Sequence, residues 1–176
     1  MYPFVRLAKE LAVHRNAPRL AVGESHVTHL VCWPSDIDLW MELNNGRTLT
    51  MMDLGRVVMF QRMGLTEVMR RKGWAGTIAG ASIRYRRRVR MFDRLELRSR
   101  ILGWDDRFTY AEQAFWKDGA CTSHGLFRMA VTSRKGMVPV ASFLAELGQP
   151  EESPPLPAWV RAWIDAEATR PWPPTP

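Results

Sequence analysis

The chain has 176 residues, 46% of them hydrophobic, which suits one folded domain with a real core and excludes a largely disordered protein. Its formal net charge is +7 and its pI is about 10.1, so an anionic partner is expected. Nucleic acid, anionic lipid and a phosphate-bearing coenzyme such as coenzyme A all meet that requirement.

Apolar runs, cysteines and histidines further limit the kind of protein this can be. The uninterrupted apolar runs are shorter than the roughly 18 residues that a membrane-spanning helix needs, so no membrane span is predicted. The first fifteen residues lack the apolar region and cleavage site of a secretory signal. Two cysteines, Cys32 and Cys121, are too few for a disulfide framework, and we expect a reducing, cytoplasmic location. The histidines show no metal-binding spacing, so no metal is expected.

Residues 1–23 are expected to form an N-terminal helix and a loop. Within residues 2–14, Phe4, Leu7 and Leu11 fall on one helical face. That face could pack on the domain or on a partner subunit, or it could lie on a membrane surface. Residues 24–33 read as a strand, in which the histidines are either sheet residues or catalysts.

The stretch from residue 33 to 64 organises the chain. Polar side chains come first, in a loop and a turn: Asp36, Asp38, Glu42, Asn44 and Asn45. A segment of about seventeen residues follows, with apolar residues at three- and four-residue spacing on two faces. A helix that is apolar on more than one face is usually buried, so we predict a central core helix.

Two charged residues lie inside this predicted helix. Asp53 and Arg56 are three positions apart, so their side chains can pair on one face. Because unpaired charges are rarely buried, an ion pair that fixes the packing explains them. A working acid at Asp53 is the alternative.

The start of the same helix offers a second kind of site. Asn44 or Asn45 is a good N-cap, and the first-turn N–H groups have no partner inside the helix. Such groups suit a carbonyl oxygen that becomes negative during a reaction, and a carboxylate just upstream would lie close by. The pattern therefore fits either a small active site or an ordinary loop-to-helix junction.

Four strands are predicted next, over residues 76–91, 95–104, 107–117 and 120–133. Short turns between them favour an antiparallel meander that curves around the central helix. The resulting class is α+β, with a sheet of about five strands wrapped around one long helix over residues 24–147. Residues 148–176 form a proline-rich linker, a short helix at 158–168 and a tail. In the strand predicted over residues 76–91, one face carries Arg84, Arg86, Arg88 and Arg90.

Two segments resemble a known family. The string DIDLWMELNNGR resembles the D-x-D-x-x-x-H-x-N-N motif of hotdog-fold acyl-CoA thioesterases of the 4-hydroxybenzoyl-CoA thioesterase-like group, with matches at Asp36, Asp38, Asn44 and Asn45. The string YRRRVRMFDRLELRSRI is similar to the family's arginine-and-turn stretch. The resemblance covers residues 24–140 and implies the hotdog fold.

The resemblance also implies catalytic roles. Asp38 would be the nucleophile or the general base for water, and N–H groups at the helix start, near Asn45, would polarise the thioester carbonyl. Some relatives place the acid inside the helix, which makes Asp53 the alternative. The chain departs from the motif at Glu42, where the family has histidine, and at Thr48, where it has an aromatic residue.

The function implied is hydrolysis of an acyl-CoA thioester, with coenzyme A as part of the substrate and no other cofactor. The expected partner is a second copy of the chain, in a homodimer or a dimer of dimers, and nucleic acid is not expected. The alternative is a non-catalytic hotdog protein that binds acyl-CoA or lipid. Arginine suits the phosphates of coenzyme A, although the arginine run also fits a solvated sheet face. The residues expected to bind substrate are Asn44, Glu42, Arg56, Arg84, Arg86, Arg88 and Arg90.

Overall fold

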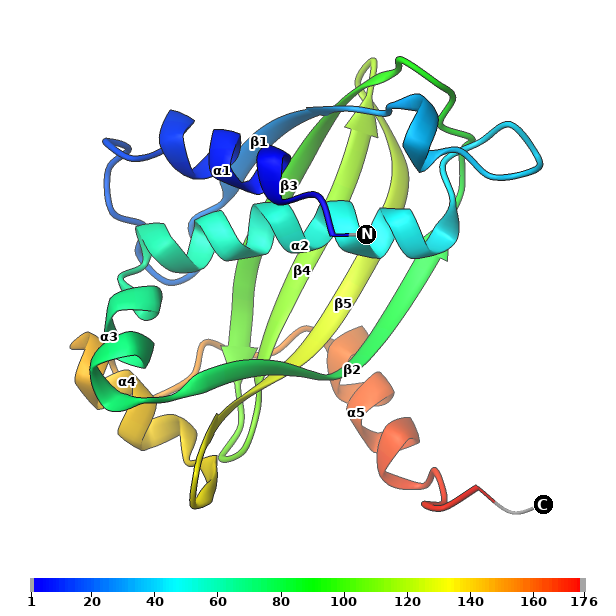
Figure 1. Ribbon diagram of the computed structural model, residues 1–176. Coiled ribbons are helices and arrows are strands. Elements are labelled where there is room, and N and C mark those ends of the chain that lie inside the picture. Colours follow the sequence, from blue (N-terminus) through cyan, green and yellow to red (C-terminus); the bar gives the residue numbers. More distant parts are fainter. Residues whose placement is uncertain (1, 175–176) are drawn as a thin grey trace.

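A computed structural model describes residues 2–174 (Figure 1). Five α-helices, one short 3-10 helix and six strands follow one another along this part of the chain. In order they are α1 (Phe4–Val13), β1 (His26–Val31), η1 (Pro34–Asp36), α2 (Asn45–Arg62), α3 (Leu65–Lys72), β2 (Ala75–Tyr85), β3 (Arg94–Trp104), β4 (Thr109–Lys117), β5 (Ala120–Ser133), β6 (Gly136–Val138), α4 (Val140–Leu147) and α5 (Ala158–Ala168).

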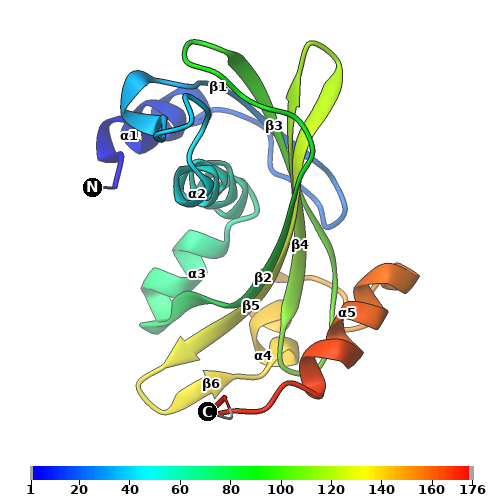
Figure 2. The same cartoon turned by 90° about the vertical axis from the view of Figure 1, so that its right-hand side faces the viewer.

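The strands form one antiparallel sheet in the order β1-β3-β4-β5-β2, with the short β6 paired to β5. The sheet curls around α2, which is seen almost end-on inside the curve in Figure 2. The predicted α+β class, with a sheet wrapped around one central helix and extra helices at both ends, is therefore confirmed.

Helix α2 is buried because its apolar residues face the sheet. Met51, Met52, Leu54 and Val58 are fully buried and contribute to a core that also contains strand residues such as Leu97. Gly64 follows α2 in a left-handed conformation (φ 79°), so α3 is a separate helix.

The strand expected over residues 76–91 is wrong in its second half, since β2 ends at Tyr85. There the N–H groups of Arg86 and Arg87 both donate to the carbonyl of Thr122, and the Leu43 N–H donates to the Val89 carbonyl. The following residues cross over the end of the sheet, so β2 pairs with β5 and the meander holds only from β3 to β5.

This correction also removes the expected face of four arginines. Alternation holds only inside a strand, and of the four only Arg84 lies in β2. Arg86, Arg88 and Arg90 belong to the crossing segment. This segment is not a strand, so nothing requires their side chains to share one face.

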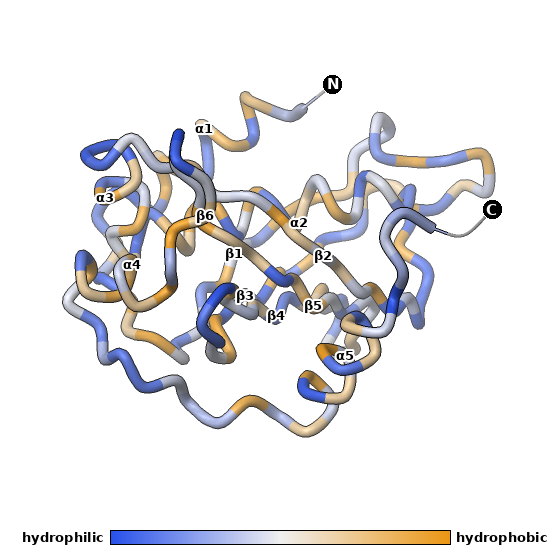
Figure 3. Tube along the Cα trace, turned by 90° about the horizontal axis from the view of Figure 1, so that it is seen from below, coloured by the Kyte–Doolittle hydropathy of each residue, from blue (hydrophilic) through white to orange (hydrophobic). Residues whose placement is uncertain are grey.

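The C-terminal part covers the outer face of the sheet. The mostly hydrophilic linker leads from α4, which the sequence analysis did not predict, to α5 (Figure 3). Helix α5 packs on the side opposite α2, where Val160 is buried with Tyr110 and Leu126 (Figure 2). The last two residues of the predicted tail lie outside the described residues.

Gly55 of α2 packs directly against strand β3. A Cβ atom there would lie 2.5 Å from Leu97 Cδ2 and 3.1 Å from Ser99 Oγ. Alanine is the better helix former by about 1 kcal/mol, but overpacking a core costs about 1–3 kcal/mol. We therefore expect Gly55→Ala to lower the free energy of unfolding, measured by urea titration. Leu97→Val removes the obstructing methyl, so Gly55→Ala should cost less stability in a Leu97→Val protein than in wild type. A cost as large or larger in the Leu97→Val protein would contradict this account.

Candidate active site

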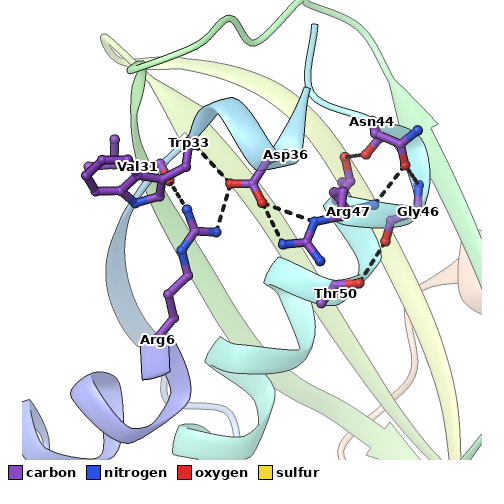
Figure 4. A network of polar contacts seen from close by, with 9 residues as sticks. Arg6, Val31, Trp33, Asp36, Asn44, Gly46, Arg47 and Thr50 are labelled. Atoms are coloured by element: carbon purple, nitrogen blue, oxygen red, sulfur yellow. Dashed lines mark hydrogen bonds and ion pairs between the residues drawn. The ribbon is translucent and has the colours of Figure 1, made fainter. Parts of the chain in front are cut away.

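One buried carboxylate fixes the loop that precedes α2 (Figure 4). Asp36 Oδ2 lies 2.8 Å from Arg6 Nη1 and accepts the N–H of Trp33 at 2.9 Å, and its Oδ1 lies 2.8 Å from Arg47 Nη2. Burial of Asp36 raises its pKa, but the bonds from Arg6, Trp33 and Arg47 outweigh burial and hold the pKa below its usual value. Asp36 therefore stays ionised and ties α1 and α2 to the loop.

The start of α2 is capped by Asn44. Its side-chain oxygen accepts the N–H groups of Gly46 (2.9 Å) and Arg47 (3.1 Å), and its carbonyl accepts the N–H of Thr48. Asn44 is therefore the N-cap, one of the two predicted alternatives. Within residues 2–174, the N–H of Asn45 makes no hydrogen bond, so it is the one first-turn donor left for a ligand.

A pocket of about 220 Å³ opens at this helix start. Its wall includes Asn45 and Thr48 of α2, Tyr85 at the end of β2, and the crossing segment from Arg86 to Val89. Glu42 also lines it and lies 3.1 Å from Arg88 Nε. The pocket wall thus contains one carboxylate, three arginines and the residue whose N–H is unpaired, and we call it the helix-start pocket.

Asp38 is paired through its backbone with Glu42, a wall residue of this pocket. The bridge between Ile37 and Leu43 forms a small hairpin, in which the Asp38 N–H donates to the Glu42 carbonyl at 2.9 Å. Asp38 Oδ1 accepts the N–H of Trp40 at 2.8 Å, and Asp38 is partly exposed. Oδ2 makes no hydrogen bond within residues 2–174. One carboxylate oxygen is therefore held and the other is available.

Asp53 and Arg56 form the expected ion pair, at 2.7 Å, and lie farther along α2. Tyr2 donates a hydrogen bond to Asp53 Oδ2 at 2.7 Å, and Arg56 donates to Gln113 at 2.6 Å. The Arg56 guanidinium also stacks on Phe127, 4.4 Å from the ring centroid. Burial, followed by the bond to Asp53, raises the pKa of Tyr2, so its hydroxyl remains protonated.

The same two charged residues border a second, mainly apolar pocket of about 330 Å³. Phe60, Met69 and Ile78 are among its apolar wall residues. Because β2 supplies wall residues to both pockets, Tyr85 to the first and Ile78 to the second, both lie between α2 and β2. We call this one the apolar pocket.

The structure groups the predicted residues unevenly. Glu42, Asn45, Arg86 and Arg88 line the helix-start pocket, Asn44 caps the helix beside it, and Asp38 is paired with Glu42 through its backbone. Asp53 and Arg56 lie at the apolar pocket. Arg84 lies elsewhere, in a cavity with Trp159 and Trp163 of α5, and Arg90 forms a turn with Asp93 through its backbone. The catalytic and binding roles of all these residues stay predictions.

Sequence reasoning missed three supporting residues. Arg6 of α1, Tyr2 just before α1 and Gln113 of β4 are all far along the chain from their partners. Helical periodicity placed Arg6 off the apolar face of α1, but no local signal pairs it with Asp36. Tertiary folding alone brings these side chains in.

Two further properties concern residues 2–174 only. No cluster of three or more metal-ligating side chains occurs in this part of the chain. No helix in it is both long enough and apolar enough to cross a membrane.

Comparison with known families identifies a match over residues 32–164 to the model of the thioesterase-like superfamily. The match includes the loop, the central helix, strands β2 to β6 and most of α5, and it begins just after β1. It therefore spans well over half of the chain.

Individual relatives carry the name Protein THEM6. The Drosophila melanogaster protein is 30% identical over 150 residues, which cover 82% of this chain and 75% of that protein. The Xenopus laevis protein is 42% identical over 82 residues, covering 47% and 40%, and the Danio rerio protein is 32% identical over 130 residues, covering 72% and 64%. The last two matches thus span less than two thirds of the relatives' length.

Solved structures show the same architecture. A probable thioesterase, YbaW, from Escherichia coli superposes with a TM-score of 0.62 at 16% identity, covering 69% of this chain and 96% of that one. A DHNA-CoA thioesterase from Staphylococcus aureus gives a TM-score of 0.63 at 9% identity, covering 82% and 91%. At such identities the likeness establishes the hotdog fold and nothing about substrate.

The Asp36 network predicts a defined pH dependence. Because the folded pKa of Asp36 lies below the unfolded value near 3.9, its stabilisation is complete above about pH 5 and is lost as the pH falls through the folded pKa. We expect Asp36→Asn to lower the free energy of unfolding by roughly 2–4 kcal/mol at pH 7, because two guanidinium groups lose their carboxylate.

Urea titrations at several pH values measure this difference. The curves of wild type and Asp36→Asn should converge in acid. Asp165→Asn, an exposed helix position without a described contact, is the matched control and should change stability by less than about 0.5 kcal/mol. A pH-independent gap for Asp36→Asn would refute the electrostatic account.

Proposed function

The chain belongs to the thioesterase-like superfamily, and from that premise we propose that it hydrolyses an acyl-CoA thioester to coenzyme A and a carboxylic acid at the helix-start pocket. The observation that carries the proposal is that Asn45, whose N–H makes no hydrogen bond within residues 2–174, is a wall residue of a pocket that also has three arginines and the Glu42 carboxylate in its wall.

The Asn45 N–H supplies the electrophilic part of the reaction. Attack on a thioester turns the carbonyl oxygen into an oxyanion. An N–H at the positive end of α2 stabilises that charge more than it stabilises the ground-state carbonyl. Since Asn44 occupies the next two N–H groups, the thioester oxygen binds at Asn45.

Asp38 supplies the base. Its free oxygen takes a proton from water, and the water oxygen attacks the carbonyl carbon as the negative charge moves onto the oxygen at Asn45. When the intermediate collapses, the C–S bond breaks and the thiolate leaves. The proton held by Asp38 then returns to the sulfur, so the products are the acid and free coenzyme A.

The two pockets divide the substrate between them. Arg86, Arg87 and Arg88 at the first pocket suit the phosphates of coenzyme A, since guanidinium groups bind phosphate oxygens with paired donors. The apolar pocket suits the acyl group. Asp53 lies eight residues beyond Asn45, about 12 Å along the helix, so the two ends of an acyl-CoA can lie along one groove.

A binding protein without turnover is the competing function. Glu42 stands where the family motif has histidine, and its carboxylate pairs with Arg88 at the pocket. That pair could hold the pocket in a form that binds coenzyme A without aligning water. This reading predicts affinity for acyl-CoA in the absence of thiol release.

We also propose that the chain forms a homodimer through the outer edge of β2. The strand AGTIAGASIRY contains no proline, lysine or acidic residue, and nearly all of it is exposed. Sheet edges that lack such protection readily pair with another strand.

A reducing, cytoplasmic location remains part of the proposal, and it is compatible with the two free cysteines.

Release of free thiol from a panel of acyl-CoAs tests the catalytic proposal. Asp38→Asn should lower kcat at least about 100-fold on the best substrate, because removal of a general base costs that much or more. Glu42→Gln and Asp53→Asn should retain most of the activity, and Asp165→Asn is the matched control.

Each other result has a definite meaning. If Asp38→Asn remains active and Asp53→Asn or Glu42→Gln does not, the base is misassigned and the chemistry belongs to the inactivated residue. If folded wild type binds acyl-CoA by calorimetry but releases no thiol from any substrate, the binding function replaces the enzyme.

Light scattering tests the dimer. The monomer mass is 20.3 kDa, so a dimer should elute with twice that mass. Ala81→Lys combined with Ser82→Lys places charges on both faces of the β2 edge, where they would meet their own copies, and should shift the mass to that of a monomer. His29→Lys on β1, the other sheet edge, is the control. A monomeric wild type would rule the dimer out.

A further inference from the structure

The loop before α2 ends in an exposed apolar tip that neither the fold nor the proposed chemistry uses. We propose that this tip, together with the adjacent turn, docks the protein on the surface of an anionic lipid bilayer. The proposal does not depend on the thioesterase activity. We call the residues Trp33, Leu39, Trp40, Met41 and Phe92 the loop patch.

Exposure singles out the loop patch. The tip residues Leu39, Trp40 and Met41 are 95%, 77% and 61% exposed, and Phe92 is 60% exposed. Figure 1 shows the loop between η1 and α2 projecting sideways from the body of the protein, at the upper right. Water-facing large side chains gathered on one projection mark an interaction site, whereas single exposed apolar residues need no explanation.

Contacts join the base of the loop to the turn that carries Phe92. The Cys32 N–H donates to the Asp93 carbonyl, and the Phe92 N–H donates to the Cys32 carbonyl at 2.6 Å. The rings of Trp33 and Phe92 meet edge to face, 6.2 Å between centroids. The patch is therefore a built surface, in which the adjacent turn is fixed against the base of the loop.

Two patch residues also occupy costly backbone conformations. Met41 (φ 58°) and Phe92 (φ 66°) are in the left-handed region, which glycine or asparagine adopts at lower cost. Buried contacts do not compensate either residue, since both are exposed. Large apolar side chains at these turn positions contribute little to folding, which favours a role in binding.

Arginines flank the patch, and their positive charge favours an anionic partner. Arg86, Arg87 and Arg88 lie in the crossing segment that leads to Phe92, and Arg90 stands two residues before it. Neither Arg86 nor Arg87 forms an ion pair within residues 2–174. Tryptophan and other apolar side chains that enter the headgroup region, flanked by arginine, are the recognition pattern of an anionic bilayer surface.

A second copy of the chain fits this surface less well. The proposed subunit contact lies along β2, whereas the patch follows β1, and these strands form the two opposite edges of the sheet. Repulsion between facing arginine runs would also oppose a symmetric contact.

Sedimentation with lipid vesicles tests the proposal. The full chain should bind vesicles of phosphatidylcholine and phosphatidylglycerol in a two-to-one ratio more tightly than pure phosphatidylcholine vesicles. Trp40→Ser should weaken binding about tenfold, because insertion buries one large apolar side chain. Arg90→Glu should weaken binding to the anionic vesicles about tenfold and leave binding to neutral vesicles unchanged.

Matched controls and contrary results are available. Trp172→Ser, at a tryptophan that is 92% exposed outside the patch, and Arg134→Glu, in the turn between β5 and β6, should bind like wild type. The proposal is overturned if wild type does not bind anionic vesicles, or if Trp40→Ser binds as tightly as Trp172→Ser. It is likewise overturned if Trp40→Ser converts a dimer to a monomer, which would make the patch a contact between copies.

Discussion

The ionised carboxylate of Asp36 is the interaction on which the site depends. It lies completely buried between Arg6 of α1 and Arg47 of α2, and it also accepts a backbone N–H from its own loop. Removing one charge from such a group leaves the others uncompensated, so the three segments can move apart only at a high cost. These contacts fix the loop, and the loop in turn positions Asp38 and the helix-start pocket. Asp36 itself is buried and does not contact a substrate.

Helix α2 then arranges chemistry along its length. Its first turn has one free donor at Asn45, its middle carries the Asp53–Arg56 pair, and beyond them lies the apolar pocket. Asn44 limits what this turn can bind. Its side chain accepts two of the N–H groups, which leaves the N–H of Asn45 for a ligand. A helix packed on several faces holds these groups more rigidly than a loop could, because its side chains are fixed by the surrounding sheet.

The loop between β1 and α2 has two halves with opposite properties. Its inner half is fixed by Asp36, while its outer half presents Leu39, Trp40 and Met41 to solvent. A rigid base makes an exposed tip effective, because ordering it on a partner costs little additional entropy. The same loop therefore joins the pocket on one side to the proposed membrane contact on the other.

Local patterns in the sequence predicted the central helix, most of the strands and the main motif. Periodicity identified the central helix, alternation and turn residues identified the strands, and the spacing of Asp38, Asn44 and Asn45 marked the helix start, because each of these signals acts over a few residues. Tertiary structure decided the rest. The end of β2 at Tyr85, and hence the pairing of β2 with β5, results from hydrogen bonds between segments distant in the chain. The same holds for the contacts of Arg6 with Asp36 and of Gln113 with Arg56, since no local rule specifies which distant partner will satisfy a buried charge.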